Sequence, residues 1–146
     1  MADLSRFGEA SFDLVFHPVS NVFVPDLAPV WREVRRVLRP GGTLLAGFMN
    51  PDIFLFDQDE AASDPLRVRH VLPYADETHL APHELQAKRA RGEALAFSHS
   101  LATQIGGQLD AGLLITGFYD DGWLDDSWPL AKHMPVAFAT RARRPG

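Results

Sequence analysis

Residues 11–48 have the sequence SFDLVFHPVSNVFVPDLAPVWREVRRVLRPGGTLLAGF, and this stretch decides the fold. It opens and closes with short apolar runs, residues 11–16 and 43–48, of the kind expected for strands covered on both faces. Between the runs, apolar residues recur at the spacing of one helix face; they are Leu27, Val30, Trp31, Val34, Val37 and Leu38. The stretch therefore predicts a strand, a helix and a second, parallel strand joined by a right-handed crossover.

Both ends of the predicted helix carry sequence signals. Asp26 is a good N-cap, and Pro29 falls in the first turn, where a missing N–H costs nothing. Pro40 is expected to stop the helix, and Gly41 and Gly42 supply permissive backbone for a tight return. The second strand is then expected to begin with the apolar run itself.

This stretch resembles part of a known family. Residues 12–15 (FDLV), the helix end at residues 36–42 (RVLRPGG) and the apolar run after it are similar to the fourth strand, the following helix and the fifth strand of class I S-adenosylmethionine-dependent methyltransferases. The RVLRPGG segment is fairly specific, because it joins a helix end, a helix stop and a strand entry at fixed spacing. The resemblance implies an α/β fold.

A second match to the family lies near the end of the chain. Ser98 or Ser100 can N-cap a helix that ends at Ala111, and residues 113–119 follow as a strand, similar to the family's last helix and penultimate strand. Residues 136–143 would be the antiparallel final strand. We therefore expect a partial Rossmann-like methyltransferase sheet, with parallel strands, a terminal antiparallel hairpin and a small inserted cap.

The helix of this second match has an unusual composition. Leu101, Ile105 and Leu109 form an apolar stripe, the face that a helix normally turns to the core. Gly106 and Gly107 cost on the order of 2 kcal/mol in helix propensity. We therefore expect these glycines to allow tight packing onto the sheet.

The beginning of the family's fold has no counterpart here. That fold normally starts with a strand that runs into a Gly-rich turn close to the cofactor, followed by an acidic residue for the ribose hydroxyls. No G-x-G run precedes Ser11, and the residues before it are too few for a βαβ unit, which takes at least ~30 residues. The expectation is a single truncated methyltransferase-like domain, residues 1–146, without the glycine-rich half.

The loop after the first strand is the best candidate for a cofactor site. Ligands of doubly wound sheets gather beyond the carboxyl ends of the parallel strands. In the family this loop lies near the methionine end of the cofactor, so the resemblance implies that His17, Pro18, Val19 and Ser20 contact S-adenosylmethionine. The alternative is that His17 and Asn21 only tie down a proline-containing loop through backbone hydrogen bonds.

The acceptor side of the site is expected to draw on both the sheet edge and the inserted segment. Asn21 and Asn50 follow the two parallel strands, and His70 and His99 approach from the cap side. Methyl transfer from a sulfonium chiefly needs in-line alignment, and a base helps only if the acceptor must lose a proton. His17 is the candidate base by position, with His70 and His99 as alternatives; a packed or exposed histidine is the other interpretation of each.

Residues 49–97 are long for a connection and should carry their own structure. Alternation predicts a half-exposed strand over residues 66–72, paired with a strand at 94–97, and residues 83–91 predict a short helix. Residues 57–64 are expected to be an acidic, solvated loop. The family often carries a substrate-covering insertion here, so the resemblance implies a cap, and with it a small-molecule acceptor.

After the strand at residues 113–119, residues 120–122 predict a turn, and residues 123–130 an apolar short helix or lid. His79 and His83 have a spacing that can hold a metal on a helix, but Pro82 interrupts the helix and no cysteine completes a set. We therefore expect no metal site.

Composition excludes other classes of protein. The chain has 146 residues, of which 46% are hydrophobic, as in an ordinary one-domain globular protein. The net charge of -5 argues against a nucleic-acid binder. The N-terminus lacks the features of a signal peptide, and no apolar run approaches the ~20 residues of a membrane span. The expectations are no membrane association and a cytoplasmic location.

Two functional hypotheses remain open. In the first, the chain is part of an enzyme that transfers a methyl group from S-adenosylmethionine to a small molecule. In the second, it is a non-catalytic domain of the same fold that acts by association with itself or a partner. Residues 11–16 would then form an apolar sheet edge, which predicts a homodimer through that edge.

Overall fold

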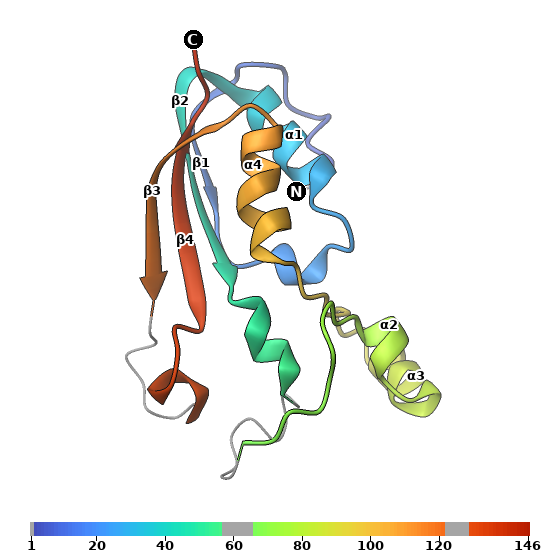
Figure 1. The fold of residues 1–146 in the computed structure, drawn as a ribbon. Helices are drawn as coiled ribbons and strands as arrows, with labels where there is room; N and C mark the ends of the chain where they lie inside the picture. Colours follow the sequence, from blue (N-terminus) through green and yellow to red (C-terminus); the bar gives the residue numbers. More distant parts are fainter. Residues whose placement is uncertain (1, 57–65, 122–128) are drawn as a thin grey trace.

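The computed structural model describes residues 2–56, 66–121 and 129–146. These residues contain a four-stranded sheet in the order β1-β2-β4-β3, in which β1 and β2 are parallel and the other two pairings are antiparallel. The strands are β1 (Phe12–His17), β2 (Leu38–Met49), β3 (Leu114–Asp121) and β4 (Ala137–Arg143). The predicted combination of parallel strands and a terminal antiparallel hairpin is confirmed (Figure 1).

Helix α1 (Ala28–Val37) makes the predicted crossover from β1 to β2. Asp26 accepts a hydrogen bond from the Ala28 N–H at 2.9 Å, although Leu27 occupies the N-cap position itself. Pro29 lies in the first turn, as predicted. Asp26 therefore satisfies one free N–H of the helix start from one residue further upstream than expected.

The expectation that Pro40 stops the helix was wrong. The helix already ends at Val37, and β2 begins with Leu38 rather than after the glycines. Phe12 lies opposite Leu38, but Leu14 lies opposite Thr43, so residues 39–42 form a bulge in β2. Within this bulge Gly41 has a φ of 79°, which a glycine adopts without strain.

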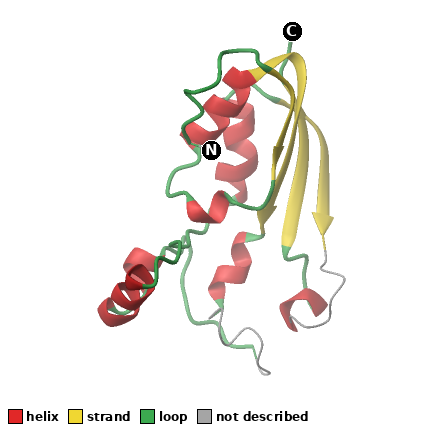
Figure 2. Cartoon of the chain, turned by 180° about the vertical axis from the view of Figure 1, so that it is seen from behind, coloured by secondary structure: helices red, strands yellow, loops and turns green. Residues whose placement is uncertain are grey.

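The second helical segment packs beside α1 on the same face of the sheet (Figures 1 and 2). It consists of a π-helical turn, η3 (Ala102–Gly106), followed by α4 (Gly107–Asp110). The Ser100 side chain caps it by accepting the Thr103 N–H at 3.1 Å, as predicted. Gly112 ends it with a φ of 82°.

The predicted orientation of this segment was wrong. Leu101 and Leu109 are 38% and 52% exposed, whereas Gln104 and Gln108 are buried. The reason is that the buried amides find hydrogen-bond partners: Gln108 Oε1, for example, accepts a bond from the Thr140 hydroxyl on β4 at 2.9 Å. The leucines consequently lie on the outer face.

The close approach that the paired glycines allow is made to α1, not to the sheet. A Cβ atom on Gly107 would lie 2.7 Å from Cδ1 of Trp31, while a Cβ on Gly106 would meet nothing within 4 Å. One glycine of the pair therefore accounts for the contact between the two helical segments.

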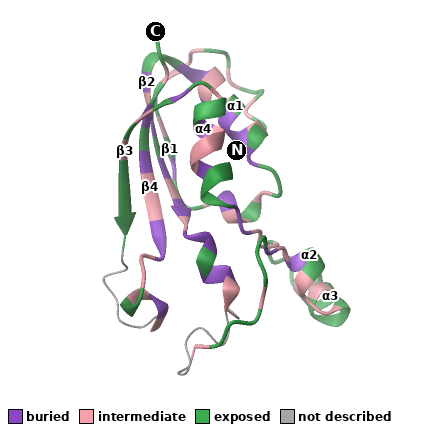
Figure 3. Ribbon diagram, viewed as in Figure 1, coloured by how far each residue is buried: buried purple, intermediate pink, exposed green. Residues whose placement is uncertain are grey.

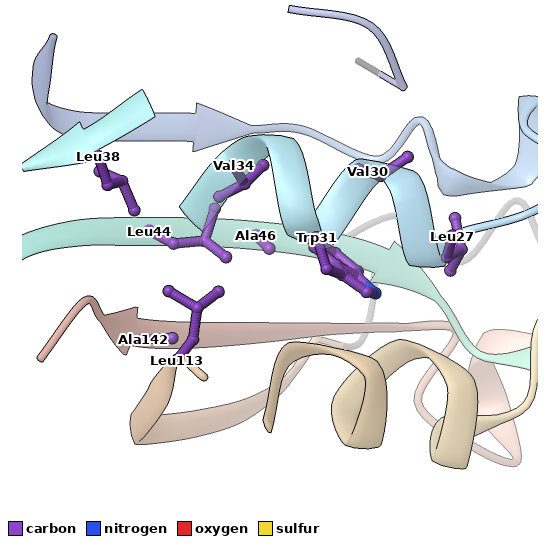
Figure 4. Packing of buried hydrophobic residues seen from close by; sticks show 9 residues of the cluster. All are labelled: Leu27, Val30, Trp31, Val34, Leu38, Leu44, Ala46, Leu113 and Ala142. Carbon is purple, nitrogen blue, oxygen red and sulfur yellow. The ribbon is translucent and has the colours of Figure 1, made fainter. Parts of the chain in front are cut away.

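The main core lies between α1 and the sheet (Figure 4). It contains Leu27, Val30, Trp31, Val34, Leu38, Leu44, Ala46, Leu113 and Ala142. A second cluster lies beyond the ends of the strands and contains Ile53, Phe54, Tyr74, Leu130 and Val136. This second cluster attaches the segment between β2 and η3 to the sheet.

That segment, residues 50–56 and 66–97 of the described chain and called the inserted segment below, carries three short helices. It contains η2 (Pro51–Leu55), α2 (Asp76–His79) and α3 (Pro82–Ala90), the last within one residue of the predicted helix. α2 and α3 extend away from the sheet in Figure 1. Another short helix, η4 (Pro129–Lys132), follows β3.

The predicted pairing between residues 66–72 and 94–97 was wrong. Val68 forms an isolated bridge with Phe56, and Phe97 forms one with Ala75. The reason lies in the partners of the second segment, because the N–H groups of residues 96–98 are used elsewhere. They donate to an Asp76 carboxylate oxygen, to the Val22 carbonyl and to the Tyr74 carbonyl.

Two further predictions concern the region after residue 113. The turn expected at residues 120–122 was wrong over its described part, since β3 continues through Asp121, which lies opposite Ala137. The acidic loop predicted at residues 57–64 and the first part of the short helix or lid predicted at 123–130 lie outside the described residues.

The other face of the sheet carries no helix of the described chain (Figures 1 and 2). Strand alternation places several apolar side chains on that face, and they are exposed; they are Leu14, Phe16, Leu45, Leu114 and Tyr119. Figure 3 shows that β3 is mostly exposed. Among the described residues, no helix is both long and apolar enough to cross a membrane.

Candidate functional site

The two parallel strands end side by side, and the segments that follow them form the carboxyl edge of the sheet. β1 ends at His17, which lies opposite Ala46, and β2 ends shortly afterwards at Met49. The chain continues into η1 (Asn21–Phe23) after β1 and into η2 after β2. Three of the predicted site residues, His17, Asn21 and Asn50, therefore lie at one edge, as expected.

His17 lies under its loop rather than on the surface. Its side chain is fully buried, with Nε2 2.7 Å from Asn21 Oδ1 and its ring edge-on to Trp31 at 5.7 Å. Burial lowers the pKa of His17, and the hydrogen bond with Asn21 only partly opposes this shift. The imidazole is therefore neutral at physiological pH.

The residues just after His17 form the outer surface of the loop. Pro18 and Val19 are exposed and Ser20 is half-buried, and the Ser20 side chain makes no capping hydrogen bond to η1. Asn21 is fully buried beneath them. The predicted set thus divides into a buried pair that supports the loop and three residues that can contact another molecule.

His99 lies against the same loop, although it is far away in the sequence. Its Nε2 is 2.7 Å from the Val24 carbonyl and 3.1 Å from the Asn21 carbonyl. Both partners are acceptors, so Nε2 carries the proton and donates to them. Nδ1 is then the nitrogen that remains for other chemistry.

The other two predicted residues have different surroundings. Asn50 caps η2 by accepting the Asp52 N–H at 3.0 Å, and it donates to the Pro135 carbonyl at 2.8 Å. His70 lies in the inserted segment, 5.0 Å from the Tyr74 ring. The structure therefore brings His17, Asn21 and His99 together, keeps Asn50 at the same edge, and leaves His70 apart.

A cavity of about 830 Å³ lies between the inserted segment and the residues that lead into η3. Pro51 and Asp52 line it at the carboxyl edge, residues 72–75 from the inserted segment, and residues 97–101 from the opposite side. Its volume is in the range of small-molecule sites. Of the predicted residues, only His99 lines it.

A second cavity of about 490 Å³ lies within the inserted segment, and His70 and His79 line it. Beside it, Asp76 accepts hydrogen bonds from Lys88 Nζ at 2.6 Å and from the Tyr74 hydroxyl at 2.8 Å. Burial raises the pKa of Asp76, but hydrogen bonds from Lys88, the Ala96 N–H and Tyr74 outweigh it and hold the pKa below its usual value. The Asp76–Lys88 pair therefore fastens α3 to α2 within the inserted segment.

His79 lies in α2 and His83 in α3, which are separate helices. Within residues 2–56, 66–121 and 129–146, no group of three or more potential metal-ligating side chains is placed to hold an ion.

Sequence reasoning missed Gln104 and Gln108, which are buried beside this site. Their spacing of four residues is a weak signal, because it equals the spacing of the apolar residues Leu101, Ile105 and Leu109 that suggested the opposite face. Only the hydrogen-bond partners of the two glutamines on the sheet decide which face of the helix is buried.

A parallel strand–helix–strand unit followed by an antiparallel hairpin, with a cavity at the carboxyl edge, defines the second part of a Rossmann-like domain. A family model described as a methyltransferase domain matches residues 1–46. The chain is 50% identical over 121 residues to the uncharacterized methyltransferase YbaJ of Bacillus subtilis, a match that covers 83% of the chain and 48% of that protein.

Two further comparisons agree with this match. A sterol 24-C-methyltransferase, ERG6B of Gibberella zeae, is 30% identical over 135 residues, covering 90% of the chain and 30% of that protein. The crystal structure of an S-adenosylmethionine dependent methyltransferase from Mesorhizobium loti superposes with a TM-score of 0.65 at 18% identity, covering 94% of the chain and 64% of that structure. At this identity the likeness shows the fold.

The chain is similar to class I S-adenosylmethionine-dependent methyltransferases over most of its length. It spans about half the length of the Bacillus relative, and less of the Gibberella one.

Proposed function

We propose that this chain forms the acceptor-binding part of an S-adenosylmethionine-dependent methyltransferase that acts on a small molecule. The observation that carries the proposal is the cavity of about 830 Å³ at the carboxyl edge of the sheet. The inserted segment forms one of its walls, so residues 49–97 take the role of a substrate cap. A location in the cytoplasm remains a prediction.

The loop after β1 fits one side of the cofactor. Pro18, Val19 and Ser20 are accessible there, while His17 and Asn21 hold the loop from beneath. When bound, the cofactor supplies a methyl group already activated by a positive sulfur. The residues of this chain then need to orient the acceptor and exclude water from it.

The position of the histidines favours His99 over His17 as the proton acceptor for an acceptor that must be deprotonated. His99 lines the cavity and has Nδ1 left over after its bonds to two carbonyls. His17 is fully buried and does not line the cavity. We therefore propose His17 as a support of the cofactor loop and His99 as the base.

Calorimetric titration with S-adenosylhomocysteine tests the proposal. We expect micromolar binding that a Val19→Asp substitution weakens at least tenfold, because the new carboxylate lies on the proposed contact surface. Val71→Asp is the matched control, since Val71 is 75% exposed and lies in the inserted segment. Absence of heat at millimolar ligand, or equal effects of the two substitutions, contradicts the proposed cofactor contact.

The second candidate function is association through β1, and the exposure of Phe16 favours it. β1 is one of the two edge strands of the described sheet, and Phe16 and Leu14 on it are 70% and 53% exposed. An open apolar strand edge is a template for pairing with another chain. We propose that two copies pair through residues 11–16.

Sedimentation of matched variants tests this association. Phe16→Lys should convert a dimer to a monomer, because a charge on the edge opposes pairing. Phe23→Lys is the control, since Phe23 is 54% exposed but lies in η1. A monomeric wild-type protein with β1 amides protected from exchange contradicts an open edge.

A further inference from the structure

Gln104 joins three segments around the candidate site. It is 2% exposed and lies in the π-helical turn η3. Its Nε2 donates to the His99 carbonyl at 2.8 Å and to the Met49 carbonyl at 3.2 Å, and its Oε1 accepts from Asn21 Nδ2 at 3.3 Å. The cavity wall, the end of β2 and the loop after β1 are thus held by a single amide.

These partners determine the orientation of the amide. Carbonyl oxygens can only accept, so the atom of Gln104 that contacts two of them must be the nitrogen. Its oxygen then faces Asn21, which must donate with Nδ2 and present Oδ1 to His17. His17 therefore carries its proton on Nε2, and its Nδ1 makes no hydrogen bond to the described part of the chain.

The backbone around Gln104 supports a specific role. π-helical turns are rare, and they occur often at functional sites. With this turn in place, Gln104 and Gln108 lie inward and the leucines outward. Gln108 donates to the Gln104 carbonyl at 3.0 Å, which holds the turn from the next turn of the helix.

We propose that Gln104 is a positioning residue that couples the loop at residues 17–21 to the cavity wall at residues 98–103. Because one amide bonds both segments, a displacement of either strains its bonds to the other. The role of this coupling in binding rests on the proposed function, because the two segments are the proposed cofactor side and the proposed acceptor side of the site. The hydrogen-bond relay itself does not depend on methyl transfer.

The first test is the position of the His17 proton in the full chain. Long-range proton–nitrogen correlation spectra distinguish the protonated from the unprotonated ring nitrogen of a neutral histidine. We expect the His17 proton on Nε2, and we expect this preference to be lost in Gln104→Met, which keeps the volume but removes the amide. A proton on Nδ1 in the wild type, or an unchanged tautomer in the variant, overturns the relay.

The second test is amide hydrogen exchange in the same variant. Loss of one buried hydrogen bond of about 1.4 kcal/mol corresponds to about tenfold faster exchange, which we expect at both residues 19–23 and 99–104. Gln108→Met separates this effect from general loosening of the helix, because the side chain of Gln108 bonds Gln104 and Thr140 rather than Asn21. Gln86→Met, at an exposed position of α3, controls for the substitution itself. Faster exchange in one segment only, or equally in Gln108→Met, refutes the coupling.

Binding of S-adenosylhomocysteine then separates the two levels of the proposal. If the wild type binds it, Gln104→Met should bind at least tenfold more weakly while Gln86→Met is unchanged. If the wild type does not bind it, the proposed function fails, and the tautomer and exchange measurements still decide the coupling. Binding that is unaffected by Gln104→Met contradicts the coupling alone.

Discussion

The contact between the two helical segments depends on the absence of a side chain at Gly107, and replacing it by alanine should destabilise the fold. An added Cβ would lie 2.7 Å from Cδ1 and 3.0 Å from Nε1 of Trp31. Such distances require displacement of a buried indole or of the helix. Overpacking of this kind typically costs about 1–3 kcal/mol.

Gly106→Ala is an internal control for the same substitution. Both glycines have helical backbone angles, with φ of -58° for Gly106 and -59° for Gly107. Each substitution therefore gains a similar amount in helix propensity, up to about 1 kcal/mol. A Cβ at Gly106 meets nothing within 4 Å, so only Gly107→Ala also has the steric cost.

Urea denaturation followed by tryptophan fluorescence measures the difference. We expect Gly106→Ala to be neutral or more stable than the wild type, and Gly107→Ala to be less stable than Gly106→Ala by about 1–3 kcal/mol. With a urea slope of about 1–3 kcal/mol/M, the midpoints should differ by roughly 1 M. Equal midpoints for the two variants would refute the proposed contact with Trp31.

Three other predictions concern polar groups. The folded-state pKa of Asp76 is lowered, so its carboxylate stabilises the fold at pH values above its unfolded pKa. This stabilisation is lost as the pH falls through the lower folded pKa. Asp76→Asn should therefore make the free energy of unfolding, measured by urea titration at pH 2–5, less dependent on pH. The pKa of His17 is also lowered, so the unfolded chain binds a proton first and the stability of the fold should decrease as pH falls below about 6.5. His17→Gln should reduce this dependence of stability on pH. An unchanged dependence would mean that His17 is accessible to solvent. Asn50→Ala removes two hydrogen bonds at the end of β2 and should lower the free energy of unfolding by about 1–3 kcal/mol, measured by thermal unfolding. A loss below about 0.5 kcal/mol, the net value of one weak hydrogen bond, would argue against the capping role of Asn50.

The strand order and the position of α1 could be predicted because their sequence signals are local. Residues 11–48 combine buried strands with a strongly amphipathic helix, and one crossover rule then sets the topology. The exact start of β2 could not be predicted, since Pro40 and the two glycines fit a turn or a bulge equally well. Pairing with β1 places them in a bulge.

The face of the last helix and the partners of the inserted segment depend on contacts distant in sequence. Leu101 and Leu109 outweigh Gln104 in hydrophobicity, and only the carbonyls at the sheet edge favour burial of the amide. Similarly, Asp76 takes the Ala96 N–H that strand pairing would have used. Neither partner is visible in a local pattern.

Among the candidate site residues, position was predicted better than role. The rule that ligands gather at the carboxyl edge of parallel strands correctly brought His17 and Asn21 to one place. It could not show that His17 would be buried, because alternation along β1 makes its inward direction depend on the strand's register. His99 reaches the same loop only through the fold of the last helical segment.

The most direct test of this account maps the binding of S-adenosylhomocysteine by amide chemical shifts in the full chain. The account predicts perturbations at Val19 and Ser20, transmitted through Gln104 to residues 98–103 at the cavity wall. Perturbations centred on the second cavity, around His70 and His79, or none at millimolar ligand, would contradict the proposal that the carboxyl edge of this sheet is the binding site.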